Sequence, residues 1–550
     1  MDLYDQLEDS QIECPVTRKR YIPLDKLRNM ITMESVIAYN DTSEVERTSS
    51  GGKGGAEHVI KYAIRAFATL VLVGRQDPIR DIVSNRLTDE YLPLGHTGSG
   101  DRRCLSSLQD KSKTFTLPRD WRGPEITAFR EKQWLFQAPL FDTTGSHLIL
   151  HRECALPLLE SGGGPIETTP SSQVSLCQLH PAHYQDGQQM QAIPVAIKEM
   201  KNDASFQLEK KNLEAIQNLN DPHLIWHIAT CQIDKRYYVL FPLANGGSLL
   251  NYWEQKNRVP RSRELILWSL RQMLGLVGAT RALHYGLEGQ MHCRHGDLKP
   301  ANILYFEKEG GSSLVIADLG VSSLHYQPTN IRTKATMTKA TTQSYEAPEA
   351  NDDERKNLPR SRTYDVWSLG CVFMEFVIWL LYDFDAILSF ERNRLVPQNP
   401  TSSFYQLRNT GKAEIPETVL QAAEALRQDP RLRGGTTLEA LVHLITEKLL
   451  VIEVEHRFNA KQLYDELRDI LSQAEQGFLD LLKEAPPSLP TPEIFLPRTS
   501  FDLIKRSTLA FHTPLGAAWS KGVYPGNRLG GVARTTKTVT SGTPQTESQY

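Results

Sequence analysis

The spacing of hydrophobic residues divides the chain into parts with different secondary structure. Up to about residue 150, apolar residues recur at steps of three and four, most clearly over His58–Gly74 and again over 79–86, which predicts helices. Between about 150 and 250 they gather in short runs typical of strands, interrupted by one helical pattern over 206–219. Beyond residue 260 long helical patterns dominate, as over 265–285 and 364–381. Strands followed by helices indicate an α+β fold with two lobes.

The chain contains several strand-like runs and several segments with few apolar residues. Strands are expected over 148–150, 155–159, 173–179, 193–200 and 237–241. The glycines of 51–55 are expected to form a flexible joint, and the polar residues around 97–120 are expected to be irregular. The proline-rich stretch 486–497 and the Gly, Thr and Ser-rich end 526–550 have too little apolar surface to offset chain entropy, so they are predicted to be disordered.

These patterns predict three regions along the chain. Residues 1–150 form a mostly helical and partly disordered N-terminal region. Residues 151–475 form a two-lobed domain, with a strand-rich N-lobe up to about residue 245 and a helical C-lobe from about 246. Residues 476–550 form a disordered tail.

Composition limits the partners that the chain is expected to have. The net charge of the 550 residues is −3, with 62 basic and 65 acidic residues, so no nucleic-acid partner is expected. Seven cysteines occur singly, which favours reduced thiols in the cytoplasm, with the nucleus as the alternative. The N-terminus lacks a secretory signal pattern. Nothing in the sequence indicates an oligomeric state.

One apolar stretch is long enough to suggest a membrane span. Residues 366–381 are mostly apolar, but they include Ser368 and Glu375 and lie between Asp365 and Asp383. A buried core helix is therefore the better interpretation, and no membrane partner is expected.

Separated segments carry groups suited to phosphoryl transfer, which needs phosphates held in place, oxygen ligands for Mg²⁺ and a carboxylate that orients the attacking hydroxyl. Val195–Lys198 is a strand that ends in a lysine, and a glutamate on the next helix could pair with it. Glu209 is the preferred partner and Glu214 the alternative. Alone this signal is weak, because a lysine at the end of a strand is usually a solvated charge.

The strongest signal is the ten-residue run His295–Leu304, which reads HGDLKPANIL. Within six residues it carries a carboxylate at Asp297, an ammonium group at Lys299 and an amide at Asn302, which are the kinds of group that phosphoryl transfer needs. The neighbouring His292–Cys293 could suggest a metal site, but no second ligand pair follows at the spacing of a structural zinc site.

A second candidate carboxylate lies further along the chain, at the end of an apolar run. Asp318 comes directly after the apolar run Leu314–Ala317, twenty-one residues beyond Asp297, so a buried strand is expected to deliver it to the metal. Further on, Thr342–Glu349 reads TQSYEAPE. The apolar helix that begins near Asp365 comes next.

In its order and motifs, this set resembles the protein kinase family, of the serine/threonine type. The resemblance covers residues 151–475, and three segments are similar to a group of filamentous-fungal kinases: 180–183, 237–253 and 361–370. It implies a bilobal α+β fold with ATP in the cleft between a small β-rich N-lobe and a larger helical C-lobe. The implied activity is transfer of the γ-phosphate of Mg·ATP to serine or threonine hydroxyls of protein substrates.

The resemblance also assigns roles to residues. Lys198, Glu209, Asp297, Lys299 and Asn302 are the implied catalytic residues, and lysine at 299 is typical of kinases acting on serine and threonine. The implied metal ligands are Asn302 and Asp318. The ATP-binding residues are expected to be Gly162, Gly163, Gly164, Val174, Ala196, Lys198, Phe241, Leu243 and Ala244. Architectural roles are implied for Asp365, which holds catalytic-loop amides, and for Arg457, which pairs with Glu349.

Two departures from the family pattern keep other interpretations open. Gly162–Gly164 is followed by Pro165 and a polar insertion in place of GxGxxGxV, so these glycines either cover the phosphates or form an ordinary flexible turn. Gly296 stands where many kinases carry an arginine that meets a phosphate on the activation segment, which weakens activation by phosphorylation within 333–341. The alternative function is a pseudokinase that acts as a nucleotide- or protein-binding scaffold. An enzyme acting on small molecules is disfavoured by the complete segment Asp318–Glu349.

Overall fold

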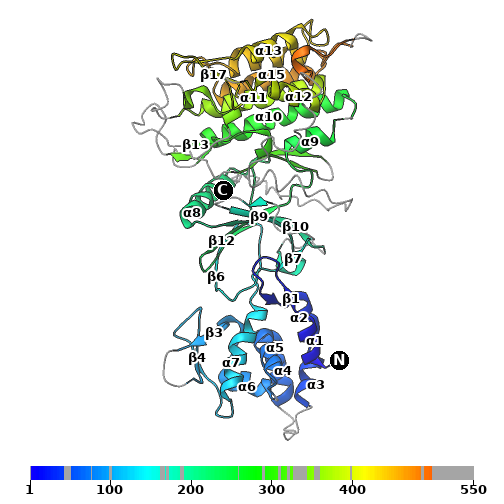
Figure 1. Ribbon diagram of the computed structural model, residues 1–550. Coiled ribbons are helices and arrows are strands. Elements are labelled where there is room, and N and C mark those ends of the chain that lie inside the picture. Colours follow the sequence, from blue (N-terminus) through cyan, green and yellow to red (C-terminus); the bar gives the residue numbers. More distant parts are fainter. Residues whose placement is uncertain are drawn as a thin grey trace, which may run out of the picture.

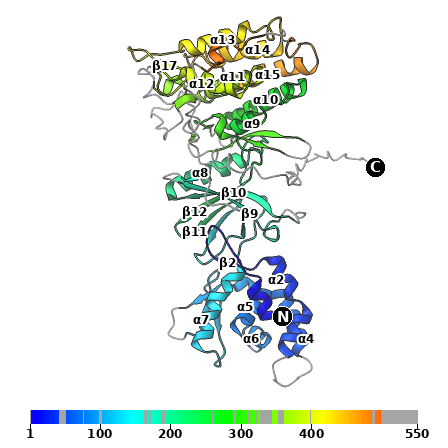
Figure 2. The ribbon, with the colours of Figure 1, turned by 45° about the vertical axis from the view of Figure 1, so that its right-hand side comes forward.

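The computed structural model shows three units stacked along one axis (Figure 1): an N-terminal unit, a β-rich N-lobe and a helical C-lobe. The turned view keeps the same order, with the N-lobe between the other two (Figure 2). The structure describes residues 2–41, 51–75, 77–97, 102–161, 167–168, 172–185, 191–257, 259–287, 292–307, 311–318, 323–325, 343–351, 360–396, 399–484 and 489–497.

The N-terminal unit has a hydrophobic core of its own, centred on a helix that is buried over Ala66–Leu72. Its helices are α1 (Leu3–Asp9), α2 (Leu24–Met30), α3 (Met33–Asp41), α4 (Gly51–Tyr62), α5 (Ile64–Val73), α6 (Pro78–Asn85) and α7 (Gly123–Lys132). Its strands are β1 (Ile12–Glu13), β2 (Arg20–Tyr21), β3 (Leu94–His96), β4 (Cys104–Ser107) and β5 (Thr114–Thr116).

Three sequence-based expectations for this unit are wrong. The glycines of 51–55 lie inside α4 rather than in a joint. The helix expected over 58–74 is two helices, because the amides of Arg65 and Ala66 donate to the carboxylate of Asp89, which starts a new helix at α5. The segment expected to be irregular contains β4 and β5 of a three-stranded sheet.

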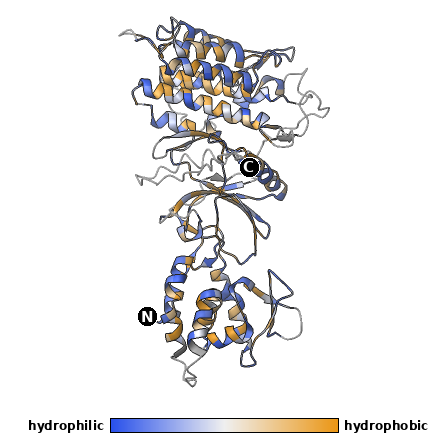
Figure 3. Ribbon diagram, turned by 180° about the vertical axis from the view of Figure 1, so that it is seen from behind, coloured by the Kyte–Doolittle hydropathy of each residue, from blue (hydrophilic) through white to orange (hydrophobic). Residues whose placement is uncertain are grey.

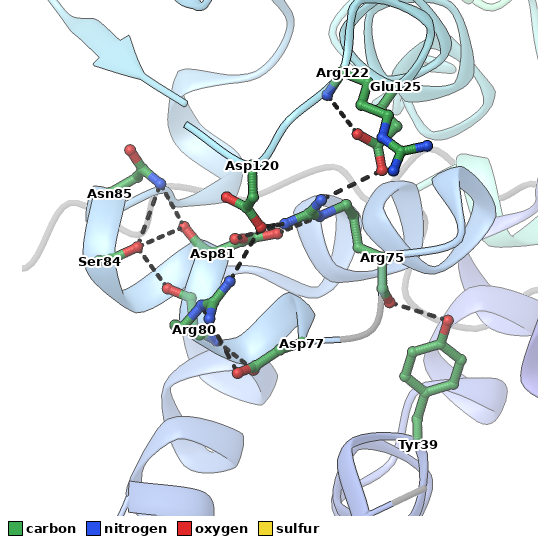
Figure 4. A network of polar contacts seen from close by, with 10 residues as sticks. All are labelled: Tyr39, Arg75, Asp77, Arg80, Asp81, Ser84, Asn85, Asp120, Arg122 and Glu125. Carbon is green, nitrogen blue, oxygen red and sulfur yellow. Dashed lines mark hydrogen bonds and ion pairs between the residues drawn. The ribbon is translucent and has the colours of Figure 1, made fainter. Parts of the chain in front are cut away.

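A buried arginine ties together distant segments of the N-terminal unit (Figure 4). Arg75 follows α5, and its guanidinium contacts Asp81 at 2.8 Å, Asp120 at 2.8 Å and Glu125 at 3.3 Å. The same guanidinium lies over the ring of Trp121. Since one cation satisfies carboxylates from α6, α7 and the loop before α7, it fixes the arrangement of these elements.

The N-lobe is built on one sheet whose strands follow the order β6-β11-β12-β10-β9-β7, with β8 paired to β9. These strands are β6 (His147–Leu150), β7 (Leu158–Glu160), β8 (Glu167–Thr168), β9 (Ser172–Leu179), β10 (Ile193–Met200), β11 (Ala229–Ile233) and β12 (Arg236–Pro242). The helix α8 (Asp203–Gln217) begins where the side chain of Asn202 accepts a hydrogen bond from Ser205 N. β10 and β12 lie as expected from sequence, whereas β7 begins three residues later than its predicted strand.

The N-terminal unit is packed directly against the N-lobe. Cys14 and Tyr21, from the β1–β2 hairpin, are fully buried in the hydrophobic cluster on one face of the N-lobe sheet. The ring of His183 lies across the same junction, because its Nε2 accepts a hydrogen bond from Leu24 N at 3.3 Å and its Nδ1 bonds the carbonyl of Pro139 at 2.9 Å. The sheet and this unit therefore share a core.

The C-lobe is a stack of helices with hydrophobic residues running through it (Figure 3). Its helices are α9 (Leu249–Gln255), α10 (Arg263–Tyr285), α11 (Thr363–Leu381), α12 (Phe384–Arg394), α13 (Glu417–Gln428), α14 (Thr437–Leu444) and α15 (Ala460–Glu475). Its strand pairs are β13 (His292–Arg294) with β16 (Ser323–His325), β14 (Ile303–Phe306) with β15 (Ser313–Ile316), and β17 (Gln406–Leu407) with β18 (Ala413–Glu414). α11, the apolar stretch predicted as a core helix, is long and apolar enough to span a membrane and is buried within this lobe.

Part of the predicted disordered tail is ordered. A short 3-10 helix spans Glu493–Phe495, and Phe495 is buried against the rings of Tyr382 and Phe390. The prediction failed for 476–484, where Leu481 is buried and Thr437 N donates to the carbonyl of Asp480, and for 489–497. Composition overlooks the docking of single apolar residues onto a core that is already formed. Residues 498–550 lie outside the described residues.

Candidate active site

The predicted lysine–glutamate pair is formed where β10 meets α8. Lys198 Nζ contacts the two carboxylate oxygens of Glu209 at 2.8 and 2.9 Å and Asp318 Oδ1 at 3.4 Å. The alternative partner Glu214 lies elsewhere, with its carboxylate 3.7 Å from Lys210 Nζ. Burial would lower the pKa of Lys198, but the carboxylates of Glu209 and Asp318 outweigh burial and raise it. The lysine therefore carries a positive charge deep in the site.

The catalytic-loop residues meet one another around one carboxylate. Asp297 Oδ2 lies 2.9 Å from Lys299 Nζ and accepts a hydrogen bond from Asn302 Nδ2 at 3.1 Å. The same amide nitrogen also donates to the backbone carbonyl of Asp297 at 2.7 Å. Lys299 and Asn302 are both buried, with 4% and 1% of their surface exposed. Packing as well as hydrogen bonds therefore holds this arrangement.

The two predicted metal ligands lie at the same end of a strand pair. Asn302 directly precedes β14 and Asp318 follows β15, and these strands pair antiparallel. Ala317 N donates to the carbonyl of Asn302 at 2.9 Å, and the ring of His295 bonds the carbonyl of Ala317 at 3.0 Å. The backbone at Asp318 is left-handed, with φ of 62°. Such a conformation is uncommon outside glycine and often marks a functional site.

These oxygens suit a magnesium ion. Asn302 Oδ1 is buried and has no hydrogen-bond partner within the described part of the chain, so it is available to bind a ligand. Amide and carboxylate oxygens are the donors that Mg²⁺ prefers, and Mg²⁺ usually takes only one or two carboxylates together with substrate phosphates. Over the described ranges no group of three or more His, Cys, Asp or Glu side chains is arranged to hold a metal ion. The residues present therefore fit Mg²⁺ bound together with a phosphate.

Most of the expected nucleotide-contacting residues are brought together on the N-lobe side of the site. Val174 on β9, Ala196 on β10 and Phe241 on β12 lie on adjacent strands, with Ala196 and Phe241 directly opposite each other. All three are buried, as is Ala244 just beyond β12, and Leu243 packs against the same cluster. The expected Gly162–Gly164, and the threonines between 333 and 341, lie outside the described residues.

An aspartate at the start of α11 holds the backbone of the catalytic loop. Asp365 is fully buried and accepts hydrogen bonds from the backbone N–H groups of His295 and Gly296, each at 2.8 Å. His284 of α10 completes the arrangement, with Nε2 2.8 Å from Asp365 Oδ2. Burial would raise the pKa of Asp365, but the hydrogen bonds from His284 and the backbone amides lower it below its usual range. The role of His284 could not be predicted from the sequence, because a lone histidine in a helical pattern carries no signal of a partner 81 residues away.

A buried ion pair closes the segment that ends at TQSYEAPE. The guanidinium of Arg457 makes two contacts of 3.0 Å with the carboxylate of Glu349 and also donates to the carbonyl of Thr363. The pair expected from the sequence is therefore formed, with both side chains almost fully buried.

The model of the protein kinase domain matches residues 184–466, just over half of the chain. The chain belongs to the protein kinase family. The matched range contains every described catalytic and metal-ligand candidate of this site. The bilobal α+β fold predicted from the sequence is thereby confirmed.

Curated relatives match parts of this kinase. A calcium/calmodulin-dependent protein kinase, cmkA, of Emericella nidulans is 28% identical over 160 residues, which cover 29% of this chain and 34% of the relative. A probable serine/threonine-protein kinase, fhkD, of Dictyostelium discoideum is 30% identical over 30% of this chain and 21% of its own length. A calcium/calmodulin-dependent protein kinase type 1 of Macrobrachium nipponense is 26% identical over 36% of this chain and 51% of its own length. The chain thus spans between a fifth and about half of the length of these relatives.

Proposed function

We propose that this kinase transfers the γ-phosphate of Mg·ATP to serine and threonine hydroxyls of protein substrates. The observation that carries the proposal is the convergence of Lys198, Glu209 and Asp318 in one ion-pair cluster. These groups come from separate segments of the chain. Lys198 is buried between two carboxylates, unlike the solvated lysine that is usual at the end of a strand. The names of the relatives, which include serine/threonine and calcium/calmodulin-dependent protein kinases, support the same activity.

Each group then has a task that its geometry permits. Lys198, held by Glu209, binds the α- and β-phosphates, and Asn302 and Asp318 hold Mg²⁺. The bound metal supplies positive charge that offsets the charge of the phosphates. Asp297 orients the substrate hydroxyl and receives its proton, while Lys299, 2.9 Å away, offsets charge at the transferred group.

This activity is tested by a phosphate-transfer assay in which the labelled amino acid of the product is identified. The folded chain is incubated with γ-labelled ATP, Mg²⁺ and a basic acceptor protein, and we expect label on serine or threonine of the acceptor or of the kinase itself. Chelation of the metal should remove the signal, because Asn302 and Asp318 bind phosphate only through it. Label on tyrosine alone would contradict the proposed specificity.

The second candidate is a pseudokinase scaffold, which the departures at Gly162–Gly164 and Gly296 keep open. It predicts a folded chain without transfer activity. If wild type transfers no phosphate and Mg·ATP also leaves its melting temperature unchanged, the scaffold becomes the better account.

A further inference from the structure

The segment that leads into the kinase sheet, residues 142–150, lies along one face of α8. We call it the β6 segment. At one end of α8, the ring of Phe206 lies 5.9 Å from the ring of His147, centroid to centroid. At the other end, Gln217 Nε2 donates a hydrogen bond of 2.8 Å to the carbonyl of Thr144. One short segment therefore contacts both the first turn and the last residue of the helix.

The residues of α8 near the β6 segment form a single stripe. Phe206, Lys210, Glu214 and Gln217 follow one another at steps of four, four and three, which places them on one face of the helix. The pKa of His147 shows that these side chains are near. Burial and the positive charge of Lys210 lower this pKa, and the carboxylate of Glu214 raises it by a smaller amount. The adjacent stripe, which includes Glu209, faces the active site and is buried.

The β6 segment is itself firmly held. Asp142 Oδ1 accepts hydrogen bonds from the backbone N–H and the hydroxyl of Thr144, at 2.9 and 2.6 Å. The buried ring of His227 donates from Nε2 to the carbonyl of Gly145 at 2.9 Å. β6 then pairs in parallel with β11 over its whole length. A rigid segment of this kind can fix the position of the helix that rests on it.

Gly145 allows the close approach between the turn and α8. Its backbone is left-handed, with φ of 73°, and a Cβ built there would lie 2.4 Å from Gln217 Oε1. Any larger residue would therefore displace the amide of Gln217 from its contact with the turn and would be strained in this backbone conformation.

We propose that the β6 segment positions α8 so that Glu209 reaches Lys198. Phe141, the residue just before the segment, is tied to the N-lobe by backbone hydrogen bonds with His183 and Gln185, each 2.8 Å long. The start of the segment is therefore anchored to the N-lobe. The inference rests on the proposed function, because Glu209 matters only if Lys198 binds ATP.

The variant Gln217→Glu removes the donor to Thr144 and brings a carboxylate to its carbonyl. We expect kcat/KM for ATP to fall by up to about tenfold, as for the loss of one hydrogen bond that positions a catalytic group. The matched control is Gln207→Glu on the exposed face of the same helix, where the amide donates to Asp203 Oδ1. The control should stay within twofold of wild type. Equal losses in the two variants would contradict the inference.

A double variant separates a positioning role from a general structural one. If Gln217 acts through Glu209, adding Gln217→Glu to Glu209→Gln should cost less than twofold more, because the helix position no longer matters. Effects that multiply in full would overturn the inference.

Amide hydrogen exchange keeps the test independent of activity. Exchange over residues 203–217 should be faster in Gln217→Glu than in Gln207→Glu. If the wild type transfers no phosphate, the proposed function fails, and this comparison alone decides whether the β6 segment holds α8. Identical exchange in the two variants contradicts it.

Discussion

At the scale of single residues, Gly296 shows how a departure from a family pattern can satisfy a backbone requirement. From sequence it marks a missing arginine. In the structure its φ is 85°, and its N–H donates to Asp365 Oδ1 at 2.8 Å. Glycine adopts this conformation without the strain that a Cβ causes. The catalytic loop is therefore held through its backbone at this position.

The substitution Gly296→Ala tests this requirement. A left-handed conformation costs an L-residue about 1–2 kcal/mol, so the free energy of unfolding should fall by that amount and the melting temperature by a few degrees. Gly278→Ala is the control, because Gly278 lies inside α10 with ordinary space for a Cβ and alanine favours helix. The prediction fails if both variants melt alike.

At the scale of elements, the contact between the β6 segment and the residues that lead into β11 is made by a buried, neutral histidine. Burial lowers the pKa of His227 to about 4, and its Nε2 bonds the carbonyl of Gly145. The unfolded chain takes up this proton near pH 6.5, whereas the folded chain resists it down to about 4. Stability linked to His227 is therefore complete above about pH 6.5 and declines as the pH falls toward 4.

The variant His227→Gln keeps a donor in the place of Nε2 but cannot titrate. Its melting temperature should fall less than that of wild type between pH 7 and pH 5, although other histidines still contribute to the slope. The comparison is made by thermal unfolding at both values. A wild-type slope in the variant would show that the ring of His227 does not titrate as described.

At the scale of the whole molecule, the N-terminal unit and the kinase share buried surface. Tyr21 is fully buried between the β1–β2 hairpin and the N-lobe sheet, where its hydroxyl reaches the carbonyl of Leu158. We expect Tyr21→Ala to destabilise the chain by about 3–5 kcal/mol, since it opens a cavity at this junction. Tyr4→Ala, at an exposed position, should change stability by less than about 1 kcal/mol. Equal melting temperatures would show that the two units do not depend on each other.

Much of the fold could be predicted from local patterns. β10, α10 and α11 lie within two residues of their predicted bounds, because alternation and helical spacing are properties of the segment itself. β4 and β5 were missed because strands of three or four residues show almost no alternation. The start of α5 depends on Asp89, more than twenty residues away, so no local pattern could reveal it.

For the site, too, local motifs could be predicted and long-range contacts could not. Asp297, Lys299 and Asn302 sit in one continuous motif, and the structure brings them together as expected. Glu209 was preferred over Glu214 from spacing, and the choice needed the fold to place one of them against Lys198. The strand at 148–150 was predicted, but its segment's contact with α8 and the bond of His284 to Asp365 were not, because these contacts join residues far apart in sequence.

The measurement that tests the central claim most directly is phosphate transfer by wild type beside Asp297→Asn. The variant keeps the shape of the side chain but removes the carboxylate that we propose receives the hydroxyl proton. With Mg·ATP raising the melting temperature of both proteins alike, we predict transfer by wild type and a loss of at least about a hundredfold in the variant. Equal rates in the two proteins would contradict the assignment of this site as the centre of catalysis.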